Sequence, residues 1–108
     1  MPLAQQGAIT VPGNYTVVAS GELQGSATAL QLPDIDCRLV IFTALASNAG
    51  NVYLGASGVT KADGTTDATS GYQLSAGAST PWLPIGNLNL LYRICDNAGD
   101  DLTYLIMR

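Results

Sequence analysis

Apolar residues along this chain gather in short runs separated by turn-forming residues, and no run repeats at the 3.6-residue spacing of an amphipathic helix. The clearest run covers residues 38–45, where apolar side chains fall on both alternating faces of a predicted strand. A strand without a polar face requires cover on both sides, from further layers of the chain or from a partner subunit. We therefore expect both faces of residues 38–45 to be covered.

Further segments have the composition or alternation of strands and end at turn-forming residues. They are 15–19, 26–32, 52–54, 72–74, 80–85, 88–95 and 102–108. The prolines at positions 81 and 84 place segment 80–85 at a sheet edge, because proline cannot donate to a central ladder. The pattern predicts an all-β fold, either an antiparallel β-sandwich or a jelly-roll-like barrel of about eight short strands.

The chain has 108 residues, the length of one domain. We assign residues 14–108 to the β-sandwich domain. Residues 1–13 contain two prolines and two glycines, and we expect a loose arm or a short edge strand there.

The tripeptide Asn-Ala-Gly occurs twice, at 48–50 and 97–99, each time between an apolar segment and a strand with an early tyrosine. Such a sequence supplies a residue tolerant of left-handed conformations and a glycine free to adopt positive φ, which a short hairpin needs. We expect two similar hairpins.

Residues 56–71 form the one long loop, with almost nothing to bury and the only lysine of the chain. By length alone this loop is either mobile or functional. Asp63 and Asp67 flank a glycine and resemble a calcium loop weakly, because the further carboxylates and the bidentate glutamate are missing. Aspartates 96, 100 and 101 crowd another loop, where capping of a solvated turn explains them better than a metal.

The chain contains no histidine and one glutamate, which removes most enzyme chemistry. Ser57 lies in a Gly-containing segment but lacks a base and the second glycine of a nucleophile elbow. Asp34 and Asp36 have no glutamate partner for a glycosidase pair. We expect no enzyme activity, catalytic residue, cofactor or metal.

The chain has four basic and eight acidic residues, which give a formal net charge of −4. This balance disfavours both nucleic acid and an anionic membrane surface as partners. The apolar stretch 39–46 is too short to span a bilayer, and the N-terminus lacks the basic and apolar regions of a signal peptide. We expect a soluble protein made in the cytosol.

Cys37 and Cys95 are the only cysteines. Two buried free thiols are the favoured interpretation in a reducing compartment, and a bridge between them is the alternative. Trp82, the only tryptophan, lies between two prolines on the predicted edge. Core packing is its favoured role, and contact with another protein or a sugar ring is the alternative.

Residues 38–108 resemble small β-rich virion proteins of tailed bacteriophages, the head decoration (cement) or minor structural proteins. The resemblance rests on an apolar strand, the first Asn-Ala-Gly loop, the segments 51–55, 57–60 and 71–74, the turn at Gly77, and two closing strands that contain Tyr92 and Tyr104. The chain departs from that pattern in a longer loop over 61–70 and in Ala76, where proline is expected.

The resemblance implies a protein without chemistry of its own that binds the major capsid protein on the surface of a phage head, after synthesis in the host cytoplasm. Strands that are apolar on both faces in a small chain imply a dimer or trimer, and we favour a homotrimer. Candidate interface residues are Val40, Phe42, Leu91 and Ile94. Candidate capsid contacts are Leu3, Ile9 and Trp82.

Two other functions are compatible with the sequence. One is a receptor- or glycan-binding module of a phage tail fibre or baseplate, because similar modules occur there. The other is a free-standing cytosolic binding protein that is a stable monomer.

Overall fold

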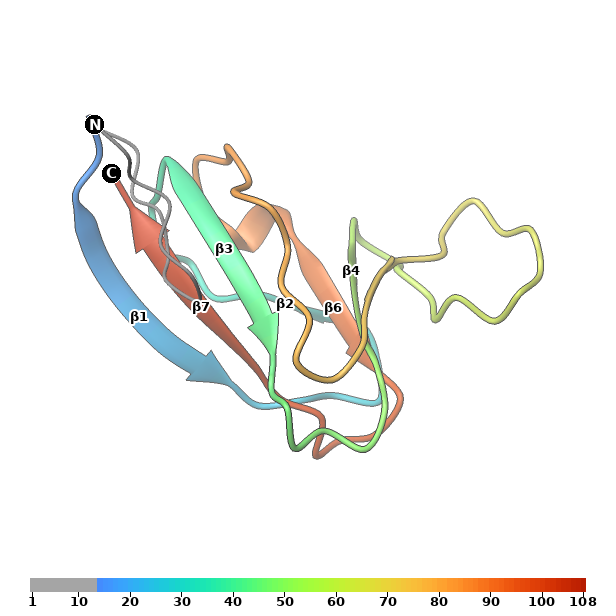
Figure 1. Ribbon diagram of the computed structural model, residues 1–108. Coiled ribbons are helices and arrows are strands. Elements are labelled where there is room, and N and C mark those ends of the chain that lie inside the picture. The colour runs from blue at the N-terminus through green and yellow to red at the C-terminus, as the bar shows by residue number, and fades with distance from the viewer. Residues whose placement is uncertain (1–13) are drawn as a thin grey trace.

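The computed structural model describes residues 14–108, which form seven strands and one short 3₁₀ helix. The elements are β1 (Val17–Leu23), β2 (Leu30–Gln31), β3 (Leu39–Ala44), β4 (Val52–Gly55), β5 (Tyr72–Leu74), the helix η1 (Leu88–Leu90), β6 (Tyr92–Cys95) and β7 (Leu102–Met107). They make two antiparallel sheets, a three-stranded sheet of order β1-β7-β3 and a four-stranded sheet of order β2-β6-β4-β5 (Figure 1). The predicted all-β class is confirmed.

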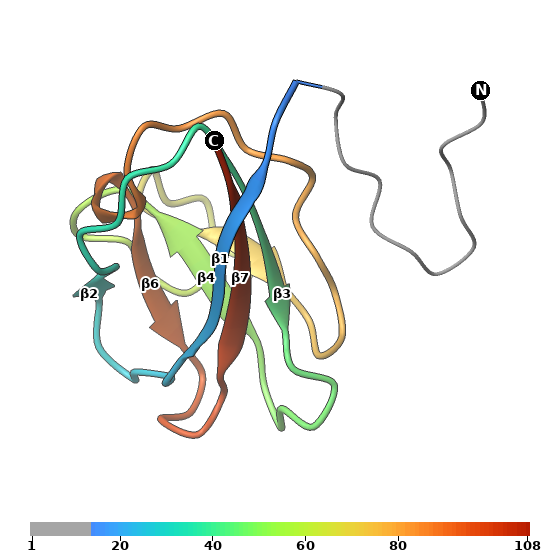
Figure 2. The same cartoon turned by 90° about the vertical axis from the view of Figure 1, so that its left-hand side faces the viewer.

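One hydrophobic core lies between the two sheets, which face each other in Figure 2. In the three-stranded sheet, β7 is central, and it pairs Ile106 with Val40 and Tyr104 with Phe42. In the four-stranded sheet, Val52 is paired with Leu74 on one side. Side chains from the inner faces of both sheets are buried in this core, which includes Val40, Phe42, Ala44, Val52, Leu54, Leu74, Cys95, Leu102 and Ile106.

Strand β3 alternates strictly between buried and half-buried residues. Its inner face is fully buried, whereas Leu39, Ile41 and Thr43 on the other face are half-buried. The expectation of cover on both faces is therefore met fully on one face and in part on the other.

The two Asn-Ala-Gly segments are not hairpin turns, which corrects the sequence prediction. The first connects β3 to β4, and the second connects β6 to β7, so each crosses from one sheet to the other. Gly50 and Gly99 are absent from the positive-φ glycines of the described chain, which are Gly58, Gly64 and Gly77. Gly50 is needed for space instead, because a Cβ there would lie 2.6 Å from the Cβ of Asp96.

The first two strands differ from their predicted bounds. Strand β1 continues through the expected turn at Ser20 and Gly21, where glycine leaves room for a tyrosine ring. A Cβ on Gly21 would lie 2.7 Å from the hydroxyl oxygen of Tyr104. Strand β2 keeps only two residues of the predicted segment 26–32. The residues before it make single bonds to the end of β6 instead of a continuous ladder, for example the 2.7 Å bond from the Cys95 amide to the Ser26 carbonyl.

Segment 77–83 runs along the outer edge of β3, so the part of the predicted edge segment 80–85 up to Leu83 lies at a sheet edge as expected. It makes isolated bridges with that strand, pairing Leu83 with Val40 and Ser79 with Thr43. Because these pairs do not form a continuous ladder, and because residues 88–90 are helical, the strand count is seven rather than about eight.

The long loop projects away from both sheets (Figure 1). A parallel bridge between Thr60 and Ser70 closes its base, and the amide of Gly71 donates to the Thr60 carbonyl over 2.9 Å. Residues 63–69 beyond this bridge are exposed.

Candidate binding surface

A buried carboxylate holds the two inter-sheet connections together. Asp100 is 1% exposed, and its oxygens accept hydrogen bonds from the amides of Ala49, Gly50 and Asn97 at 3.0, 3.1 and 2.9 Å. The Asn97 side-chain amide adds a fourth bond of 3.0 Å. Burial raises the pKa of this carboxyl, but the bonds to Gly50, Asn97 and Ala49 outweigh burial and leave the pKa below its ordinary value.

The neighbouring aspartates extend this connection. Asp96 accepts a 2.9 Å bond from the Asn51 amide and a 3.1 Å bond from the Tyr53 hydroxyl. Asp101 accepts a 2.8 Å bond from the amide of Gly25. Each carboxylate is therefore engaged by donors of the fold, and within residues 14–108 no group of three or more metal-ligating side chains is found.

Arg93 is a buried base on the inner face of the four-stranded sheet. Its Nε and Nη2 atoms donate to the carbonyl oxygen of Gln24 at 3.1 and 2.7 Å. Burial lowers the pKa of this guanidinium, which keeps its charge because arginine titrates far above neutrality. The side chain serves to hold the segment before β2 against β6.

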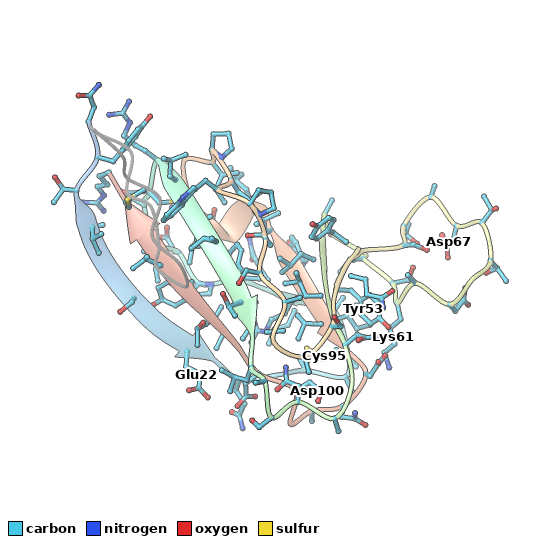
Figure 3. The ribbon with its side chains drawn as sticks, in the orientation of Figure 1. Glu22, Tyr53, Lys61, Asp67, Cys95 and Asp100 are labelled. Carbon is cyan, nitrogen blue, oxygen red and sulfur yellow. The ribbon has the colours of Figure 1, made fainter. Side chains whose placement is uncertain are left out.

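The carboxylates of the long loop act locally. Asp63 accepts bonds from the Thr65 hydroxyl and amide, and Asp67 accepts the same pair from Thr69. These bonds lower the pKa of both carboxyls, with the Thr65 hydroxyl as the largest cause for Asp63 and the Thr69 amide for Asp67. Figure 3 shows Asp67 far out on the loop, remote from Asp100.

The other residues considered for catalysis lie on the surface. Ser57 is exposed near the start of the long loop. Asp34 and Asp36 both accept from the side-chain amide of Asn87, at 2.7 and 3.1 Å, which ties a surface connection to the start of η1. Neither position combines a nucleophile with a base.

Both thiols are free and buried, as the favoured interpretation of the sequence expects. The Cys37 thiol donates to the Ile85 carbonyl at 3.2 Å. Burial is the largest cause that raises the pKa of each thiol, and the charge of Asp36 adds to it for Cys37.

The structure corrects two of the predicted interface residues. Val40 and Phe42 are both 0% exposed within a single chain, so neither has surface to offer a second copy. The apolar face that the sequence identified belongs to the internal core. Leu91 and Ile94 are half-buried, on the segment entering β6 and on β6 itself.

Of the three predicted capsid contacts, one lies within the described residues. Leu3 and Ile9 lie outside residues 14–108. Trp82 is half-buried in the segment that flanks β3.

An apolar pocket lies where the four-stranded sheet faces the segment around Trp82. It has a volume of about 270 Å³, and its lining surface is almost entirely carbon. The lining residues are Leu54, Tyr72, Thr80, Pro81, Leu83 and Leu91. Sequence reasoning named Leu91 as an interface candidate and Tyr72 as an aromatic available to a sugar, but it did not bring them together. The lining residues come from β4, β5, the edge segment and the segment entering β6, which meet only in the folded chain.

A second, wider hollow of about 460 Å³ lies on the outer face of the three-stranded sheet. Its lining includes Glu22, Ile41, Thr43 and Leu105, a mixture of polar and apolar groups. This face holds the half-buried side of β3, so it is the part of the apolar strand that remains accessible to a partner.

Comparison of the chain with protein-family models, curated proteins and solved structures finds no match. Within the described residues, no helix has the length and apolar character needed to cross a membrane.

Proposed function

We propose that the protein is a non-enzymatic virion structural protein, a decoration or cement protein that binds the assembled head of a tailed phage. The resemblance of residues 38–108 to such proteins suggests this role. The accessible apolar pocket beside Trp82 carries the proposal, since a protein that acts by contact needs a surface of this kind. The carboxylates of the inter-sheet connections fit a non-enzymatic role, because they accept bonds from backbone amides and stabilise loops.

Stabilisation in this role needs no chemistry. A protein that binds the assembled lattice and has no affinity for the expanded or broken one shifts the equilibrium toward the assembled form by mass action. The acidic net charge of −4 is compatible with a protein surface as partner and unfavourable for packaged nucleic acid.

The proposal includes a homo-oligomer, with a trimer favoured, located on the capsid surface. Val40 and Phe42 have no part in its interface, and Leu91 lines the pocket assigned to the capsid partner. Ile94 and the outer face of the three-stranded sheet remain available. The proposed fold class is a β-sandwich rather than a closed jelly-roll barrel, because the two sheets share a core but no described strand.

The test uses purified phage heads that lack accessory proteins. We expect the native protein to co-sediment with heads at a saturable ratio and to raise the temperature at which they release DNA. The Asp63→Asn variant serves as a control with altered charge on the projecting loop. Failure to bind any assembled head at micromolar concentration contradicts the proposal.

A glycan-binding module of a tail fibre or baseplate is the second candidate. The observation that favours it is Tyr72, which is 58% exposed next to the base of a polar loop, where an aromatic ring can stack on a sugar. This function predicts saturable binding to host polysaccharide that the Tyr72→Ala variant loses. A protein that binds heads but no polysaccharide excludes it.

A further inference from the structure

The pocket beside Trp82 offers almost no hydrogen-bonding groups, because its lining surface is nearly all carbon. Its buried hydroxyl, on Thr80, accepts a 3.0 Å bond from the Phe42 amide, and the other hydroxyl belongs to Tyr72, which is 58% exposed. Leu54, Leu83 and Leu91 contribute only carbon to the lining. A sugar ring would lose its hydration there without replacement, whereas an apolar group would gain from burial.

The volume of the pocket suits one large apolar side chain. A cavity of about 150 Å³ lined by aliphatic residues accommodates benzene. The pocket here holds about 270 Å³, which is room for a phenyl or isobutyl group with its attached chain.

An open sheet edge borders the same pocket. Strand β5 is the outermost strand of the four-stranded sheet, and its Tyr72 lines the pocket. Within residues 14–108, the backbone of β5 bonds to β4 and to no further strand. Alternate amides and carbonyls of an outermost strand point away from its sheet and can pair with an added strand.

We propose that this pocket and the β5 edge together form an anchor site for an extended segment of a partner protein. The segment adds to β5 as a strand and inserts one leucine- or phenylalanine-like side chain between Tyr72 and Leu83. Backbone pairing supplies affinity and the pocket supplies selectivity, the division found in strand-addition complexes. This inference rests on the proposed function, because it names the surface by which the chain holds its protein partner.

Amide signals of the lining residues report on this site. Pro81 and Leu83 line the pocket, whereas Trp82 between them is not among the lining residues. Occupation of the pocket is therefore read from the amides of residues such as Tyr72 and Leu83 rather than from the indole.

The experiment titrates the native protein with the blocked peptide acetyl-Thr-Thr-Phe-Thr-Thr-amide and follows amide chemical shifts. Two matched peptides carry asparagine in place of phenylalanine, or N-methyl groups on alternate residues. We expect saturable binding of the first peptide, and binding weaker by about tenfold or more for each of the others, since one loses apolar burial and the other loses backbone pairing.

Two variants locate the binding. Tyr72→Ser removes one wall of the pocket at a residue that is 58% exposed, so the fold is retained and affinity falls by about fivefold or more. Leu90→Ser is the matched control, because Leu90 is 63% exposed and does not line the pocket. Equal affinity for the phenylalanine and asparagine peptides, no saturable binding, or equal loss in both variants overturns the proposal, and unimpaired binding of the N-methylated peptide overturns its strand-addition part.

The outcome is distinguishable from failure of the proposed function. If the peptide binds as expected but heads are not bound, the anchor site stands and the decoration role fails. If heads bind the native protein and the Tyr72→Ser variant equally, the decoration role stands and the anchor site is wrong.

Discussion

At the scale of single residues, the stability of this protein depends on a few carboxylates with specific partners. The chain has eight acidic residues, and Asp100 is the one that the described fold buries completely (Figure 3). From the second inter-sheet connection it bonds to the amides of Ala49 and Gly50 in the first, which lie 51 and 50 residues earlier in the sequence. This carboxylate therefore acts as a long-range tie rather than as a chemical group.

Replacement of Asp100 by alanine leaves three backbone amides and one side-chain amide without their acceptor. Because unsatisfied donors in a buried site are costly, we expect the free energy of unfolding to fall by about 2–4 kcal/mol. Urea denaturation followed by fluorescence measures the change. Asp63→Ala is the control, since that carboxylate is exposed on the loop, and an equal effect of both substitutions would contradict this role of Asp100.

The same carboxyl predicts a pH dependence. Its pKa in the folded protein lies below the ordinary value of 3.8, so its contribution to stability is complete above that value. The contribution is lost as the pH falls through the folded-state pKa, because protonation weakens the bonds from Gly50, Asn97 and Ala49.

We therefore expect the difference in unfolding free energy between the native protein and Asp100→Asn to be constant near neutral pH and to shrink below about pH 4. Urea denaturation at a series of pH values measures it. The exposed carboxyls of Asp63 and Asp67, whose pKa values are also lowered, are present in both proteins and cancel in the difference. A difference that does not change with pH contradicts the prediction.

At the scale of elements, the connections between sheets are packed as closely as the strands. Gly25, in the segment between β1 and β2, donates its amide to Asp101 and lies against the second connection. A Cβ on this glycine would overlap the Asp100 carbonyl oxygen and lie 2.9 Å from that of Ala98. Both contacts are with backbone, which cannot rotate away as a side chain can.

The substitution Gly25→Ala should therefore lower the unfolding free energy by more than about 2 kcal/mol, because the connection must shift to admit a methyl group. Gly99→Ala is the matched control in that same connection, since nothing lies within 4 Å of its added Cβ and its φ is not positive. Thermal denaturation of both variants measures the contrast. A comparable loss of unfolding free energy in the two variants would contradict the role of the close contact at Gly25.

At the scale of the whole molecule, the long loop is a separate unit from the two sheets. Its base is closed by the Thr60 and Ser70 bridge, and its outer residues bond mainly to one another. The core contains no side chain from residues 61–69.

Replacement of residues 62–68 by two glycines should leave the unfolding free energy within about 1 kcal/mol of the native value, because loop closure depends weakly on length. Circular dichroism and urea denaturation test this. The shortened protein keeps the pocket and Tyr72, so head binding through the pocket should also be retained. A protein that no longer folds would show that the loop supports the sheets.

The sequence alone determined the local features of this protein. Short apolar runs with period-two alternation predicted an all-β chain, the 38–45 strand and the edge position of segment 80–85, because strand geometry is encoded in neighbouring residues. The lack of histidine and the length of the loop over 56–71 followed from the residues as written.

Only the tertiary structure decided which faces and loops meet. The residues of 38–45 that sequence reasoning offered to a second copy are internal, because the other sheet covers Val40 and Phe42. The Asn-Ala-Gly segments cross between sheets because their flanking strands belong to different sheets, and bonds from Asp100 and Asp96 tie one connection to the other. The apolar pocket is assembled from residues between 54 and 91, and its existence depends on long-range packing that no local pattern contains.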